Sequence, residues 1–175
     1  VTYASMVFSA METDYFPRLS AVNNNRDSVN LIVNRQIEVS LLIVSPMLAS
    51  LIIALPVLMP LLNSGEFMPV VGMAQVAVFS MYLKAVSLPV AYVTLAKGDS
   101  VAYLILEAIY DVLLVLLIVY GYSRWGLWGT GLALSVSYLL DMILIFVYAR
   151  LRYGFVMSRQ VVCYMLVMLP IGGLA

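Results

Sequence analysis

The chain has 175 residues, of which 64% are hydrophobic, and nine basic and nine acidic side chains give a formal net charge of zero. Soluble domains usually contain about 45–50% apolar and about 25% charged residues, so this composition excludes a water-soluble enzyme or nucleic-acid reader. The absence of His and the presence of a single Cys argue against zinc sites, His-based catalysis and disulfide frameworks. The composition therefore predicts an integral membrane protein, with no cofactor and no metal.

The apolar stretches at both ends of the chain are too short to cross a bilayer, which needs about 20 residues of helix. They are residues 1–11 and 160–175. The first has no signal-peptide pattern, and the chain begins at Val1. We expect a fragment of a longer protein that is cut within two helices. The alternative is a complete protein with short interfacial ends.

A polar stretch, residues 12–38, separates the first apolar piece from the next. Within it, residues 14–20 are typical of a turn at the membrane surface, and residues 23–27 carry a helix-start signal. The apolar side chains that follow recur at helical spacing: Val29, Ile32, Val33 and Ile37. They predict an amphipathic helix over roughly residues 27–38 that lies on the membrane and runs into the first span.

Four long apolar stretches follow, each sufficient to cross a bilayer as a helix. They are residues 39–62, 69–96, 101–122 and 125–149. Transmembrane strands would be about ten residues long with alternating polarity, and no such alternation occurs. The sequence therefore predicts an all-α, polytopic transmembrane helical bundle.

The loops between these stretches differ in their content of Lys and Arg. One set of alternate loops carries seven of these cations (Arg18, Arg26, Arg35, Lys97, Arg150, Arg152 and Arg159), and the other set carries only Arg124. Because cytoplasmic loops are rich in Lys and Arg, we expect the first set to face the cytoplasm. An aromatic belt would then mark the outer surface: Tyr120, Tyr122, Trp125 and Trp128.

Four charged residues lie within the predicted spans: Lys84, Glu107, Asp111 and Asp141. A rise of 1.5 Å per residue from the cytoplasmic ends gives depths of about 18, 9, 15 and 12 Å, respectively. Ionised groups at such depths are costly and usually face a bundle interior or an aqueous path. These four residues are therefore candidates for a substrate or ion pathway. The alternative is structural, with Lys84 and Asp111 forming an ion pair between adjacent helices.

Motifs for catalysis are incomplete. The pair Tyr110-Asp111 is typical of intramembrane aspartyl proteases, but the GxGD partner motif is absent, as is any GxSxG site. The glycine string over residues 126–131 follows no strand, so close helix packing is a better interpretation than phosphate binding. We therefore expect a protein that is not an enzyme.

Several strings resemble, in order, a known family of transporters. They are Phe16-Pro-Arg-Leu-Ser20, Leu62-Asn-Ser-Gly-Glu-Phe67, Lys84-Ala-Val-Ser-Leu-Pro-Val-Ala-Tyr92, Leu95-Ala-Lys-Gly-Asp99 and Gly126-Leu-Trp-Gly-Thr-Gly-Leu-Ala133. This series is similar to the C-terminal lobe of polysaccharide flippases, the O-antigen and capsule repeat-unit translocases of the multidrug/oligosaccharidyl-lipid/polysaccharide exporter superfamily. At position 111, where many relatives carry Asn, this chain has Asp.

The resemblance implies part of one lobe of a two-lobe, multi-pass transporter in the bacterial inner membrane. Its cargo would be an undecaprenyl-pyrophosphate-linked oligosaccharide for surface polysaccharide biosynthesis. The expected partners are this lipid-linked oligosaccharide, membrane lipid and a coupling proton or cation, with no nucleic acid. The alternatives are a multidrug/cation antiporter of the same superfamily and a membrane scaffold that transports nothing.

The uneven distribution of cations predicts the orientation of the chain. In intact cells, a membrane-impermeant thiol reagent should label Glu66→Cys from outside and should leave Arg152→Cys unlabelled. Labelling of Arg152→Cys but not Glu66→Cys would reverse the orientation and the depths derived from it.

Overall fold

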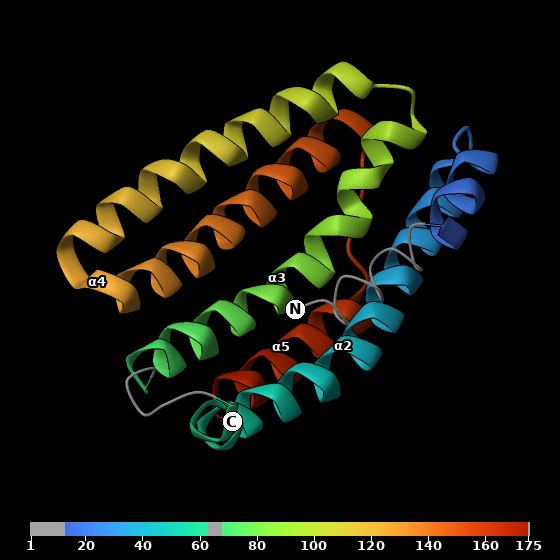
Figure 1. Ribbon diagram of the computed structural model, residues 1–175. Helices are drawn as coiled ribbons and strands as arrows, with labels where there is room; N and C mark the ends of the chain where they lie inside the picture. Colours follow the sequence, from blue (N-terminus) through green and yellow to red (C-terminus); the bar gives the residue numbers. More distant parts are fainter. Residues whose placement is uncertain (1–12, 63–67, 175) are drawn as a thin grey trace.

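The computed structural model of the chain describes residues 13–62 and 68–174 (Figure 1). The helices are α2 (Arg26–Leu62), α3 (Met68–Ala96), α4 (Ser100–Tyr153) and α5 (Arg159–Leu174), with a further helical segment, residues 13–21, before α2. Every regular element in these ranges is a helix, which confirms the predicted all-α bundle. The predicted helix end at residues 1–11 and most of the predicted outer loop, residues 63–67, lie outside the described residues.

Helix α4 folds back on itself as two antiparallel arms (Figure 1). Gly126 joins the arms with φ 60° and ψ −141°, a conformation that a side chain would disfavour. The predicted spans at residues 101–122 and 125–149 fall on the two arms. The expectation that Gly126 serves close packing was wrong, because no atom of a packing neighbour lies within 4 Å of where its Cβ would be.

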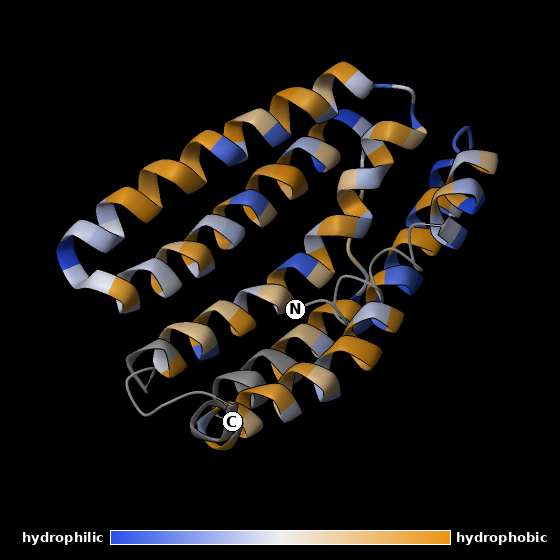
Figure 2. Ribbon diagram, in the orientation of Figure 1, coloured by the Kyte–Doolittle hydropathy of each residue, from blue (hydrophilic) through white to orange (hydrophobic). Residues whose placement is uncertain are grey.

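Three of the described helices, α2, α3 and α4, are long and apolar enough to cross a membrane. Both arms of α4 expose large apolar side chains along their length; Leu116 is 64% and Val119 63% exposed. Figure 2 shows isolated hydrophilic positions within these otherwise hydrophobic arms. An apolar surface of this extent would not be stable in water, which indicates a membrane-embedded protein.

Helix α3 lies between the hairpin of α4 on one side and α2 on the other, and α5 packs mainly against α2. Glycines allow the closest approaches. Gly121 faces Gly129 across the two arms, and a Cβ on either residue would overlap the backbone of the other. A Cβ on Gly131 would lie 2.7 Å from the carbonyl oxygen of Met73 in α3. The prediction of close packing at Gly129 and Gly131 is therefore confirmed.

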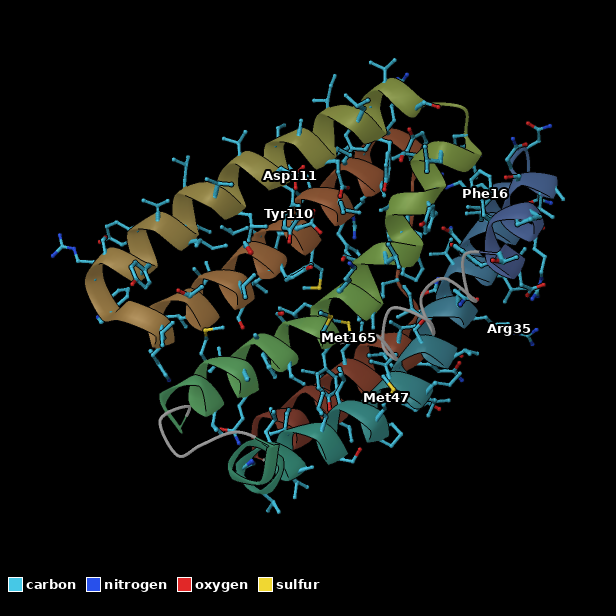
Figure 3. The ribbon with its side chains drawn as sticks, viewed as in Figure 1. Phe16, Arg35, Met47, Tyr110, Asp111 and Met165 are labelled. Carbon is cyan, nitrogen blue, oxygen red and sulfur yellow. The ribbon has the colours of Figure 1, made fainter. Side chains whose placement is uncertain are left out.

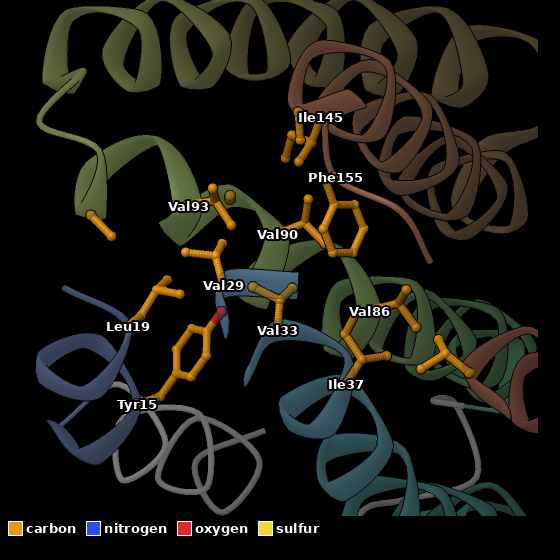
Figure 4. Close-up of a cluster of buried hydrophobic side chains, with 14 of the residues drawn as sticks. Tyr15, Leu19, Val29, Val33, Ile37, Val86, Val90, Val93, Ile145 and Phe155 are labelled. Carbon is orange, nitrogen blue, oxygen red and sulfur yellow. The ribbon is translucent and has the colours of Figure 1, made fainter. Parts of the chain in front are cut away.

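The amphipathic segment at residues 27–38 is the beginning of α2 and continues without interruption into the first predicted span. The prediction that its apolar face lies against lipid was wrong. Val29, Val33 and Ile37 are buried in a cluster with side chains of α3 and of residues 13–21 (Figure 4). An apolar stripe indicates that one face of a helix is shielded from water, but either lipid or another part of the protein can shield it.

The prediction of a turn over residues 14–20 was wrong, because these residues belong to the helical segment 13–21. Tyr15 and Leu19, one turn apart, face the same cluster, and the Tyr15 hydroxyl donates a hydrogen bond of 2.7 Å to the carbonyl oxygen of Pro89. Burial raises the pKa of Tyr15 above its ordinary value. The predicted helix start at residues 23–27 is confirmed: after a turn over residues 22–24, α2 begins at Arg26, and the side chain of Asn25 caps it by accepting from the N–H groups of Asp27 and Ser28.

A side chain from α3 replaces the hydrogen bond that a proline removes from α2. Pro56 has no N–H to bond to the carbonyl oxygen of Ile52 one turn earlier. The amide nitrogen of Gln75 donates to this oxygen at 3.3 Å. The hydrogen bond fixes the register of α2 against α3 where lipid offers no alternative donor.

The glycine contacts generate a stability prediction. Gly131→Ala should lower the free energy of unfolding by about 1–3 kcal/mol, because its Cβ would force the second arm of α4 away from the Met73 carbonyl. SDS-induced unfolding of the purified full-length protein in mixed micelles measures the change. The matched control is Gly72→Ala, since a Cβ there would only touch Trp128, at 3.5 Å. Equal stability of the two variants would contradict the close approach.

Candidate functional site

Polar side chains from three neighbouring helical segments meet in the otherwise apolar bundle. Helix α3 provides Lys84 and Ser87, the first arm of α4 provides Glu107 and Tyr110, and the second arm provides Ser137, Tyr138 and Asp141. These seven residues are referred to below as the polar cluster. Figure 3 labels Tyr110, together with the adjacent Asp111, on the first arm.

Lys84 is the cation of the polar cluster. Its Nζ lies 6.0 Å from the centroid of the Tyr138 ring, within the range of a cation–π contact. The same ammonium interacts electrostatically with Glu107 on the first arm and with Asp141 on the second. Lys84 therefore connects α3 to both arms of the α4 hairpin.

Asp141 has a second contact with α3. The hydroxyl of Ser87, a buried residue of α3, donates a hydrogen bond to the Asp141 carboxylate. Glu107 lies close enough for the two carboxylates to repel each other. Asp141 thus has a donor, a cation and a competing anion around it, although the sequence suggested no partner for this residue.

Tyr110 and Tyr138 join the two arms. Their ring centroids are 5.5 Å apart with an interplanar angle of 42°, and their side chains are hydrogen-bonded to each other. Ser137 also hydrogen-bonds to Tyr110. These contacts fix the separation of the arms at the level of the charged residues.

Sequence reasoning missed the neutral members of the cluster as site residues: Ser87, Tyr110, Ser137 and Tyr138. A signal for two of them was present. In an antiparallel hairpin, residues equally distant from the centre of the turn face each other. Tyr110 and Tyr138 each lie 14 residues from Arg124, and Glu107 and Asp141 each lie 17 residues from it. A turn centred on Arg124, two residues before Gly126, would have revealed both pairs.

Asp111 occupies a different position from the other three predicted charges. Its side chain is exposed on the first arm, and its charge acts on Glu107 one turn away. The contacts described for Lys84 involve Tyr138, Glu107 and Asp141, so a Lys84–Asp111 pair stays a prediction. The structure thus brings together Lys84, Glu107 and Asp141, with Asp111 at the edge.

A second polar network lies at the end of α2 where the helix begins. Arg26, Asn30 and Asn34, spaced one helical turn apart, hydrogen-bond to the backbone of residues 154–158, which connect α4 to α5. Asn34 makes two of these bonds, to the carbonyl oxygen of Val156 at 3.0 Å and from the N–H of Ser158 at 2.7 Å. These three residues of the polar face therefore bind main chain of the segment that connects α4 to α5.

The turn between α3 and α4 is tied to the same end of the bundle. Asp99 accepts hydrogen bonds from Tyr153 at 2.9 Å and Tyr148 at 3.4 Å, and the Arg152 guanidinium lies 3.9 Å from the same oxygen. Lys97 donates to the backbone oxygen of Asn23. These contacts hold both ends of the α4 hairpin beside the start of α2.

Among the described residues, no group of three or more His, Cys, Asp or Glu side chains is arranged to hold a metal ion. No protein-family model, no curated protein and no solved structure matches the chain. The function is therefore argued from the polar cluster itself.

The hydrogen bond between Ser87 and Asp141 generates the next prediction. Ser87→Ala should lower the free energy of unfolding by about 1–2 kcal/mol, because the Asp141 carboxylate loses its neutral donor. Ser80→Ala is the matched control: Ser80 is equally buried on α3, but its hydroxyl bonds to the carbonyl of Ala77 in its own helix. SDS-induced unfolding in mixed micelles measures the free energy of unfolding of both variants. Equal decreases would show that the hydrogen bond from Ser87 to Asp141 adds no stability.

Proposed function

We propose that the chain is part of one lobe of a transporter that moves an undecaprenyl-pyrophosphate-linked oligosaccharide across the bacterial inner membrane. The proposal combines the family resemblance of the sequence with the position of the polar cluster. The protein would act as a translocase rather than as an enzyme, with the lipid tail of its cargo remaining in the bilayer.

The observation that carries the proposal is the exposure of two carboxylates on an apolar helix. Glu107 and Asp111 lie exposed on the first arm of α4, between apolar side chains such as Leu104 and Val115. Lipid cannot accommodate two adjacent carboxylates at low cost. This side of the arm is therefore expected to face water or polar cargo.

The charge of the polar cluster suggests which part of the cargo it contacts. With all groups ionised, Lys84 supplies one positive charge, whereas Glu107 and Asp141 of the cluster, together with Asp111 at its edge, supply three negative charges. Such a site repels pyrophosphate. Sugar hydroxyl groups can donate to the carboxylates, and the Tyr110 and Tyr138 rings offer apolar faces against which a sugar can pack.

A multidrug or cation antiporter is the second candidate, and one contact favours it. The Lys84 ammonium lies over an aromatic ring and near two carboxylates, which are the groups that bind an organic cation. In that case the carboxylates would contact the cargo directly. A scaffold without cargo is the third candidate, and it leaves the exposure of Glu107 and Asp111 without a role.

Export assays separate these candidates. Cells that depend on the full-length protein and carry the Lys84→Met, Asp111→Leu variant should accumulate the lipid-linked intermediate on the cytoplasmic side, and Glu107→Gln should do the same. Both variants remove charge from the pathway without adding bulk. Normal export by both would eliminate a transport role for the cluster.

The control for export removes charge elsewhere. Asp14 and Arg18 form an exposed ion pair of 3.0 Å in the helical segment 13–21. The Asp14→Asn, Arg18→Gln double variant should export normally, since exposed pairs contribute little. Immunoblots of membrane fractions establish that all variants are inserted in equal amounts. If cells carrying Glu107→Gln lose resistance to amphipathic cations but still export the lipid-linked intermediate, the result would instead support the antiporter.

A further inference from the structure

The tip of the α4 hairpin gathers exposed aromatic side chains around a cation. Four aromatic residues near the Gly126 turn are more than half exposed: Tyr120, Tyr122, Trp125 and Trp128. Arg124 lies among them in the sequence and is also exposed. Figure 2 shows the turn as a hydrophilic and intermediate band between two hydrophobic arms. The tip therefore differs in character from the arms that lead to it.

The length of the arms places this tip at the level of the lipid headgroups. The first arm runs from Ser100 to Trp125, about 39 Å at 1.5 Å per residue, whereas the hydrocarbon core of a bilayer is about 30 Å thick. At the other end of the hairpin, Asp99 accepts a hydrogen bond from Tyr153, and the Arg152 guanidinium lies 3.9 Å from the same carboxylate. Polar groups thus mark both ends, and the apolar length between them is sufficient to cross the hydrocarbon core.

The guanidinium of Arg124 lies beside a pair of aromatic rings. Its central carbon is 5.8 Å from the centroid of the Tyr120 ring, within the range of a cation–π contact. The Tyr120 ring in turn packs edge-to-face on Trp125, with centroids 6.3 Å apart and an interplanar angle of 87°. In the part of the chain that the structure describes, no hydrogen bond or ion pair occupies the N–H donors of Arg124. The aromatic pair therefore positions a cation whose donors are available to a ligand.

The carboxylates of the described residues are too distant to pair with Arg124. Helix α3 contains no Asp or Glu, and the nearest carboxylates on the hairpin are those of Asp111 and Asp141, about 20 and 25 Å away along their arms. At headgroup depth, the anion that a phospholipid bilayer supplies is the phosphate. A guanidinium can donate to two phosphate oxygens at once, which makes arginine well suited to this group.

We propose that the tip of the α4 hairpin, residues 120–128, binds the phosphate of a phospholipid headgroup. Arg124 donates to the phosphate oxygens, the Tyr120 ring positions the guanidinium, and the exposed ring of Trp125 packs beside the lipid at the boundary between headgroup and chains. Aromatic side chains alone would favour the interface without selecting an anion. The bound lipid would anchor the tip in its leaflet whatever the cargo, so the proposal is independent of the proposed function.

Lipid titration of the purified full-length protein in detergent tests the site. Native mass spectrometry measures the affinity for each bound phosphatidylglycerol. Arg124→Gln should weaken one of these binding events about fivefold, the usual contribution of one arginine near an anionic membrane surface. Tyr120→Leu should weaken the same event, because the guanidinium is no longer held beside a ring. Arg124→Lys should have a smaller effect than Arg124→Gln, because an ammonium keeps the charge but loses the two-point contact.

The matched control is Ser123→Ala. Ser123 is adjacent to Arg124 and also exposed, but its hydroxyl donates to the carbonyl oxygen of Tyr120 at 2.8 Å. This variant should bind phosphatidylglycerol with unchanged affinity. Dioleoylglycerol, which has lipid tails but no phosphate, should bind equally to the unaltered protein and to Arg124→Gln.

Three results would overturn the proposal. The first is an unchanged affinity for phosphatidylglycerol in Arg124→Gln. The second is an equal loss of affinity for dioleoylglycerol, which would show that the tip contacts lipid tails without selecting phosphate. The third is a loss in Arg124→Gln that affects undecaprenyl phosphate but not phosphatidylglycerol, which would assign the tip to cargo rather than to membrane phospholipid.

Discussion

A polar group within an apolar helix bundle has no water to bond to, and most of the observed architecture follows from this constraint. The carbonyl oxygen that Pro56 leaves without a donor receives the Gln75 amide. The Tyr82 hydroxyl donates to the carbonyl oxygen of Ser45, and that of Ser135 to Val76. Each of these bonds joins two helical segments, so satisfying a polar group also fixes the position of a neighbouring segment.

The polar cluster meets this constraint only in part. Ser87, Tyr110, Ser137 and Tyr138 find partners within the cluster, but Glu107 and Asp141 share one nearby cation. Replacing a buried ion pair by apolar packing is often neutral or stabilising. The charges of the cluster are therefore a weak means of stabilising the bundle, and charged groups within membrane spans more often line a substrate or ion path.

The sequence predicted the helices well because length and hydropathy determine whether a segment can span a bilayer. It also predicted that Lys84, Glu107 and Asp141 lie within the membrane, at depths of about 18, 9 and 12 Å, but by depth it paired Lys84 with Asp111. It did not predict their partners, because depth fixes the position along a helix axis but not which face of which helix lies opposite. The same limitation explains the error at residues 27–38, whose apolar stripe was assigned to lipid and whose Asn30 and Asn34 instead bind residues 154–158.

The α4 hairpin is fixed at both of its ends. At one end the arms are joined at Gly126, and at the other Asp99 is bonded to Tyr148 and Tyr153. Between these points Gly121 and Gly129 hold the backbones in contact near the turn, whereas larger side chains separate them around the cluster. The arms are therefore tied by the chain itself at the Gly126 end and by Asp99 at the other end. Around the polar cluster they are joined through side chains, such as the packed rings of Tyr110 and Tyr138, rather than through their backbones.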